Sequence, residues 1–112
     1  GILTKLVSSL PVPASDLCAW LGPAISRQHY EVGEDVWGKF PPEHCYPHKE
    51  ASHRMLDLAG IAKAELESLA LHRVDESGCC VYEQKGFFSH RASQHEQRPE
   101  GRFVTLIVRQ PL

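Results

Sequence analysis

The chain has 112 residues, of which 42% are hydrophobic and 23% are charged, and its formal net charge is −2 at pH 7. This length and composition are ordinary for one globular domain and leave too few residues for two. No basic stripe is present that would neutralise nucleic-acid phosphates, and no apolar run approaches the ~18 residues of a membrane span. We therefore expect neither a nucleic acid nor a membrane as a partner.

The cysteines and the first residues of the chain predict a cytoplasmic setting. Cys18, Cys45, Cys79 and Cys80 match no disulfide framework, and the adjacent pair Cys79-Cys80 would bridge only with strain. The first residues lack both a methionine and the apolar core of a signal peptide. We expect reduced thiols in the cytoplasm, in a segment of a longer protein.

The first half of the chain predicts a helix, a buried strand, a short helix and a loop. Apolar residues recur at helical spacing over residues 1–10, and prolines end this helix. Residues 17–21 form a short apolar run that is typical of a buried strand. A helix is expected over residues 33–40. The polar, proline-rich stretch 41–53 predicts a mobile surface loop.

The second half contains the clearest helix, over residues 57–71. Asp57 is a natural N-cap, and an apolar stripe follows it. A short strand is expected from Arg73 toward Cys79, then a second mobile loop over residues 91–101. Residues 103–108 are continuously apolar, which predicts a closing strand buried on both faces.

These elements predict a mixed α/β domain with an incomplete sheet, and the α+β class is what the family resemblance given below implies. The apolar strands at 17–21 and 103–108 need neighbours on both sides, and the chain offers few strands. Either a missing N-terminal half of the protein completes the sheet, or the chain associates with itself to cover it.

One run of side chains resembles a metal site. His44-Cys45-Tyr46-Pro47-His48 places three possible ligands within five residues, with His53 nearby. Structural zinc sites usually use two separated ligand pairs, and Pro47 lies between the candidates. We interpret this run as a solvated loop and predict no metal ligand in this chain.

Cys79-Cys80 is a candidate reactive pair. A nucleophilic thiol needs a base or cation beside it, and His90 and Arg91 are the candidates. The alternative is that at least one of the two cysteines is buried and structural, which we favour.

Arg91 and Arg102 stand at the two ends of the second polar loop. Because the guanidinium fork suits phosphate and carboxylate, the pair could clamp an anionic ligand. The alternative is ordinary surface charge.

Four short blocks of sequence follow one another over nearly the whole chain. They are Ala19-Trp20-Leu21-Gly22-Pro23-Ala24-Ile25 with Tyr30-Glu31-Val32, then Leu56-Asp57-Leu58, then Cys79 with Phe87-Phe88-Ser89-His90-Arg91, then Gly101-Arg102. In this order they resemble the signature segments of the laccase-domain (YfiH-like) family.

The resemblance implies that residues 1–112 are the C-terminal portion of one laccase-like domain, a layered α/β/β/α sandwich. It also implies a zinc (or copper) ion bound by two histidines and a cysteine of the N-terminal half, so that no ligand lies in this chain. The implied activity of the complete protein is phosphorolysis of purine nucleosides such as adenosine and inosine, with adenosine deamination as a side activity. Copper-dependent polyphenol oxidation is the alternative, and the segment alone is expected to be inactive.

The resemblance assigns this half a role in binding nucleoside and phosphate. Arg91 and Arg102 match family arginines, and Phe88 and Ser89 are expected to line the cleft, with Phe88 stacking on the base. No residue of the chain is expected to be catalytic. Several positions depart from the family pattern, namely Cys80, His90, Ala92 and Glu100. A glutamate beside a phosphate clamp is unfavourable by like-charge repulsion.

Overall fold

A computed structural model describes residues 1–110 of the chain. Its elements follow one another in the order α1 (Ile2–Ser9), η1 (Ala14–Asp16), β1 (Cys18–Leu21), β2 (Glu31–Gly33), α2 (Glu34–Trp37), η2 (Pro42–His44), β3 (Cys45–Pro47), β4 (His53–Leu56), α3 (Leu58–Ser68), β5 (Arg73–Glu76) and α4 (His90–Glu96). Helices and strands are mixed, with one parallel and one antiparallel sheet, which confirms the α+β class.

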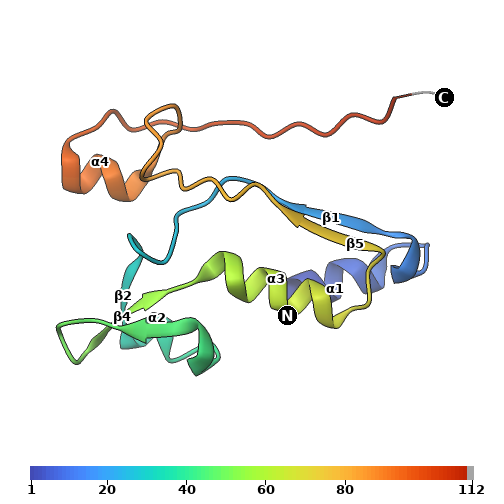
Figure 1. The fold of residues 1–112 in the computed structure, drawn as a ribbon, viewed down its shortest axis with the longest axis horizontal. Coiled ribbons are helices and arrows are strands. Elements are labelled where there is room, and N and C mark those ends of the chain that lie inside the picture. Colours follow the sequence, from blue (N-terminus) through green and yellow to red (C-terminus); the bar gives the residue numbers. More distant parts are fainter. Residues whose placement is uncertain (111–112) are drawn as a thin grey trace.

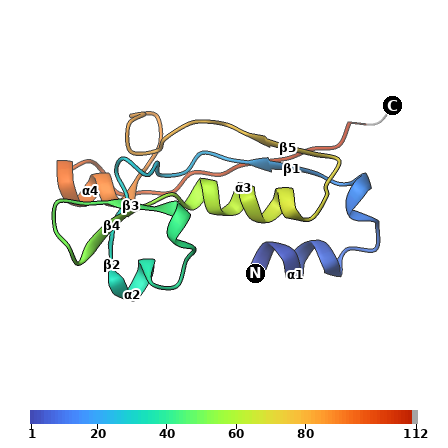
Figure 2. The same cartoon turned by 60° about the horizontal axis from the view of Figure 1, so that its bottom comes forward.

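The parallel strand pair β1–β5 and the helix α3 form one part of the fold (Figure 1). Both strands and the helix were expected from the sequence, as was the cap, where the Asp57 carboxylate accepts a hydrogen bond from the Gly60 amide at 2.9 Å. Two parallel strands need a long crossover connection, and α3 is part of it. Figure 2 shows α3 between α1 and the strand pair, so α3 covers one face of the sheet and α1 packs on α3.

The antiparallel sheet β2-β4-β3 forms the other part of the fold. The prediction of a loop over 41–53 is wrong here, because η2, β3 and the start of β4 lie in this stretch. Prolines do not prevent a strand at a sheet edge, where the missing N–H faces away from the ladder, and β3 is such an edge strand. The helix expected over 33–40 is shorter and spans only α2.

A second predicted loop, over 91–101, is also largely helical. Residues His90–Glu96 form α4, and the Ser89 side chain caps it by accepting a hydrogen bond from the Ala92 amide at 3.3 Å. The helix ends at Gln97, whose φ of 54° is left-handed. Only residues 97–101 keep the expected irregular conformation.

The prediction of a doubly buried strand over 103–108 is wrong for this structure. No strand forms between residues 97 and 110, and the side chains of Val104, Leu106, Ile107 and Val108 are about four-fifths exposed. Their apolar, β-branched character favours a strand, but a strand needs hydrogen-bonding neighbours. None of the other described strands lies beside this segment.

The molecule is elongated and its core is small. It measures 48 × 31 × 19 Å with a radius of gyration of 16.1 Å, where a compact domain of this length would have about 13 Å. The buried apolar side chains are Val32, Leu56, Leu66, Cys80, Val81 and Ala92. Over residues 1–110, none of the helices combines the length and the apolar character needed to cross a membrane.

Candidate functional site

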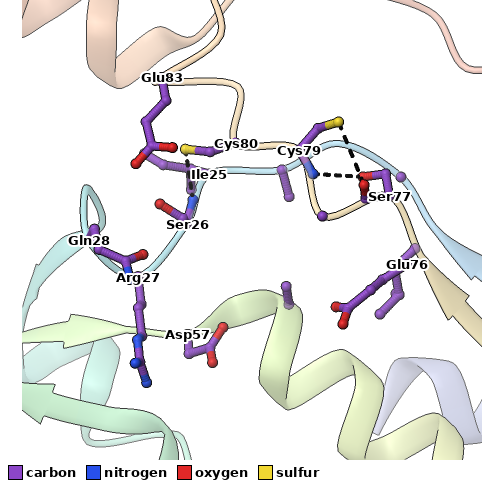
Figure 3. Close-up of a pocket in the computed structure, with 15 residues that line it drawn as sticks. Ile25, Ser26, Arg27, Gln28, Asp57, Glu76, Ser77, Cys79, Cys80 and Glu83 are labelled. Atoms are coloured by element: carbon purple, nitrogen blue, oxygen red, sulfur yellow. Dashed lines mark hydrogen bonds between the residues drawn. The ribbon is translucent and has the colours of Figure 1, made fainter.

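A pocket opens at the carboxyl ends of the parallel strands β1 and β5 (Figure 3). Its cavity volume is about 440 Å³, and we call it the carboxyl-edge pocket. It lies between the loop after β1, the loop after β5 and the start of α3. The carboxyl edge of parallel strands is the usual place for a ligand in α/β proteins, because the connecting loops and helix N-termini converge there.

Carboxylates dominate the charge of the carboxyl-edge pocket. Asp57, Glu76 and Glu83 line it, with Arg27 as the one guanidinium among its walls. The Arg27 guanidinium lies 4.1 Å from the centre of the Tyr46 ring, and this contact holds it to one side of the pocket. An anion would therefore be repelled here, whereas hydroxyl or amino groups could donate hydrogen bonds to the carboxylates.

Cys80 lies in the wall of this pocket and is buried, as expected for at least one of the two adjacent cysteines. Its sulfur accepts a hydrogen bond from the Ser26 amide at 3.3 Å (Figure 3). Burial raises the pKa of the Cys80 thiol, but hydrogen bonds from Ser26, Glu83 and Tyr82 outweigh burial and hold the pKa below its ordinary value. The Ser26 Oγ is itself buried without a partner of ordinary hydrogen-bond geometry in residues 1–110.

The two side chains proposed from sequence to activate this thiol are engaged elsewhere. The His90 ring lies 2.8 Å from a carboxylate oxygen of Glu100, and Arg91 donates to the backbone carbonyl of Glu31. Neither residue lines the carboxyl-edge pocket. The lowered pKa of Cys80 therefore comes from hydrogen bonds to its sulfur and not from His90 or Arg91.

A second pocket adjoins the first, and Ile25 lines both. We call it the arginine pocket, and its cavity volume is about 330 Å³. Its walls are Ile25, Tyr30, Val81, Phe88, Ser89, His90 and Arg91. Three of the four residues expected to bind substrate, Phe88, Ser89 and Arg91, thus come together.

Arg91 is held in the arginine pocket by two contacts. Its Nη1 donates to the Glu31 carbonyl at 2.8 Å, and its guanidinium lies 5.2 Å from the centre of the Tyr30 ring. A guanidinium carries five N–H donors, and the contact with Glu31 uses one of them. Arg91 can therefore fix its position and still present a donor fork to an anion.

Ser89 and Phe88 have different roles in the arginine pocket. The Ser89 hydroxyl caps α4, while Phe88 is 43% exposed. The ring packs closely on Gly101, where a Cβ would lie 2.8 Å from it. Glu100 pairs with His90, so its carboxylate is partly neutralised near the arginine when His90 is protonated.

Arg102 does not join the other three residues. It lines neither pocket, and its Nη1 donates to the neighbouring Gly101 carbonyl at 3.0 Å. The two-arginine clamp predicted from the sequence is not assembled in this structure. The substrate-binding role of Arg102 stays a prediction, and the residue does not contact the arginine pocket.

The metal-like run of the sequence is only partly brought together. His48 and His53 meet beside Glu31, with one donor atom from each residue within 4.8 Å of the others. The thiol of Cys45 instead faces the Pro41 carbonyl at 3.5 Å. Glu31 was missed as a candidate ligand, because it lies on another strand, far from the histidines in sequence.

The cluster does not match the metal site that the family resemblance implies. That site uses two histidines and a cysteine, and residues 1–110 bring no thiol to a pair of imidazoles. Copper–thiolate centres need the same donors. The described residues therefore do not supply the donor set of the family's metal site.

The multi-copper polyphenol oxidoreductase laccase family matches residues 1–110. The chain is 32% identical to a purine nucleoside phosphorylase of Pseudomonas aeruginosa over 96% of its own length and 46% of that protein. It is 34% identical to a purine nucleoside phosphorylase of Xylella fastidiosa over 94% of its length and 42% of that protein. The chain thus spans less than half the length of these relatives.

A solved structure gives the same assignment. The crystal structure of a Neisseria meningitidis protein of the family named DUF152 superimposes with a TM-score of 0.73 at 29% identity, over 82% of this chain and 40% of that one. Fold and pockets define an α+β protein with adjoining ligand pockets at the carboxyl edge of a parallel strand pair. The chain belongs to the multi-copper polyphenol oxidoreductase laccase family, whose YfiH-like relatives are named purine nucleoside phosphorylases.

Proposed function

We propose that this chain forms the C-terminal portion of a purine nucleoside phosphorylase and contributes its phosphate-binding arginine. One observation carries the proposal: Arg91 is fixed in a pocket with an aromatic wall, directly beside a polar pocket rich in carboxylates. The names of the relatives supply the reaction.

Phosphorolysis needs an anion and a nucleoside held side by side. The free N–H groups of Arg91 suit the phosphate, and Phe88 offers a ring face for stacking on the base. In the neighbouring pocket, the carboxylates of Asp57 and Glu83 are acceptors for ribose hydroxyls or for an amino group of the base. Positioning and electrostatics of this kind carry most of the catalysis in such transfers.

The rest of the active site is proposed to come from the other half of the protein. The resemblance implies a zinc (or copper) ion there, and a bound metal would polarise the reactants. The exposed apolar segment 103–108 is the surface that this half would cover. We also expect the complete protein to be cytoplasmic, and residues 1–112 alone to be inactive.

Two other activities are weaker candidates. Self-association of a small non-catalytic protein would also cover the exposed apolar segment, but it would leave the fixed guanidinium of Arg91 without a role. Copper-dependent oxidation of phenols needs a donor set that residues 1–110 do not bring together.

The experiment uses the complete protein with inosine or adenosine, with and without inorganic phosphate. Chromatography follows the free base, ribose 1-phosphate and inosine formed from adenosine. We expect base release that depends on phosphate and yields ribose 1-phosphate. Base release without phosphate, inosine as the sole product from adenosine, or no turnover would contradict the proposed function.

A further inference from the structure

The antiparallel sheet places Glu31, His48 and His53 on one face. In the register, Glu31 is opposite Met55 and Gly33 is opposite His53, and residues two apart on a strand share a face. Glu31 is therefore a diagonal neighbour of His53 on the same side of the sheet. If the β3–β4 register is continued one residue, His48 falls opposite His53, and their ring centres are 5.8 Å apart.

The donor atoms of these three side chains converge. His48 Nε2 lies 3.3 Å from one carboxylate oxygen of Glu31, and His53 Nε2 lies 3.9 Å from the other. Ligand atoms at the corners of a tetrahedral zinc site are about 3.3 Å apart, as follows from metal–nitrogen bonds of about 2.0 Å. Small side-chain rotations are therefore enough to bring all three donors to one ion.

From this geometry we infer that Glu31, His48 and His53 bind a divalent transition-metal ion of the zinc type. Two imidazole nitrogens and one carboxylate are the donors of open zinc sites, whereas calcium and magnesium prefer oxygen donors alone. Glu31 and His53 are each about one-third exposed, which leaves a coordination position for water. The site differs in donors from the two-histidine, one-cysteine site that the family resemblance implies.

Glu50 orients the ring of His53 for this role. Its carboxylate lies 3.0 Å from His53 Nδ1, and in the tautomer that donates a hydrogen bond to it the lone pair of Nε2 faces the cluster. This is the carboxylate–histidine–metal arrangement that fixes ring orientation in metal sites.

His48 is less well prepared than His53. The Glu50 amide donates to His48 Nδ1 at 3.1 Å, which places the ring proton on Nε2, facing Glu31. Metal binding through Nε2 requires the proton to move to Nδ1 and breaks the contact with the amide. We therefore expect micromolar affinity, below that of sites with both rings preset, and stronger binding as pH rises because the ion competes with protons.

The test is a titration of the metal-depleted complete protein with Co²⁺, followed by visible absorption, with Zn²⁺ as competitor. We expect the wild-type protein to bind one equivalent more than the double variant His48→Ala/His53→Ala. His53→Ala alone should weaken this binding at least about tenfold, as is usual for the loss of a metal-site residue. Glu31→Gln keeps the side-chain size but removes the charge, and should also weaken it.

His29→Ala is the matched control. The His29 ring lies 3.0 Å from a Glu83 carboxylate oxygen, so it is a histidine–carboxylate pair outside the cluster. This variant should keep the full metal equivalent. Equal Co²⁺ stoichiometry in the wild type and the double variant would overturn the inference. If the double variant does not fold, unchanged Co²⁺ affinity in Glu31→Gln would overturn it instead. Either result would show that these side chains form ordinary ion pairs. Neither readout depends on phosphorolysis.

Discussion

At the scale of single residues, Arg98 does most to fix the loop that carries the arginine pocket. Its guanidinium donates to the carbonyls of Tyr82 at 2.6 Å, Phe87 at 3.1 Å and Gln84 at 3.5 Å, and its side chain is 17% exposed. These carbonyls belong to the segment between Cys80 and Phe88, which has no helix or strand of its own. The arginine supplies the donors that a regular element would otherwise provide.

Replacing Arg98 with alanine should therefore lower the free energy of unfolding by about 2 kcal/mol, because charged hydrogen bonds to partly buried carbonyls are lost. Arg98→Lys should recover only part of this, since an ammonium cannot span the same fork of acceptors. Urea unfolding of the complete protein measures both values. Equal stability of the alanine variant and the wild type would show that the loop is stable without the hydrogen bonds of Arg98.

The sequence predicted only some of these residue roles. Phe88, Ser89 and Arg91 were selected by resemblance, and the structure brings them into one pocket, although Ser89 also caps a helix. Arg98 and Glu31 were missed, because their partners are backbone carbonyls and side chains that are distant in sequence. Periodicity and local motifs carry no information about such contacts.

At the scale of elements, α3 was the most predictable part of the chain. An apolar stripe and an N-cap are both local signals, and the cap forms between residues three apart. Because α3 packs on β1 and β5 and its start borders the carboxyl-edge pocket, this local signal also positions the site.

Asp57→Ala should destabilise the protein by about 1 kcal/mol through loss of the cap, whereas Asp57→Asn should cost only a few tenths, because asparagine caps about as well. Chemical denaturation checks the difference between the two variants. If alanine and asparagine are equally destabilising, the charge of Asp57 in the pocket matters and the cap does not.

The strands that were predicted wrongly depend on pairing across the sheet. Strands β3 and β4 have three and four residues and no clear alternation, and they form because they pair with each other and with β2. The segment 103–108 has the opposite pattern, with strong strand propensity but no paired strand among residues 1–110. Strand propensity alone does not form a strand when no other strand pairs with the segment.

At the scale of the whole molecule, many large apolar side chains are exposed. Ile2, Leu6 and Trp20 are about half exposed or more, in addition to the nearly bare segment 103–108. Together with the relatives of twice the length, this surface supports the proposal that another part of the protein covers it.

Ile107 tests this proposal, since its side chain is 83% exposed in the isolated chain. In the complete protein, Ile107→Ala should cost about 2–5 kcal/mol if the segment is a buried strand, but less than about 0.5 kcal/mol if it stays at the surface. Lys85→Ala, a change in the exposed loop after β5, serves as a surface control. A negligible effect of Ile107→Ala in the complete protein would contradict burial of this segment.

The most direct test of the account is the KM for phosphate in the complete protein when Arg91 is changed. Arg91→Ala should raise it by at least about tenfold through loss of a charged donor fork, with the KM for inosine little changed, and Arg91→Lys should lie between. Arg73→Ala, which alters an exposed arginine on β5, should leave both values unchanged. If the KM for phosphate stays at the wild-type value in a folded Arg91→Ala variant, the arginine pocket does not bind phosphate and the proposed role of this chain is wrong.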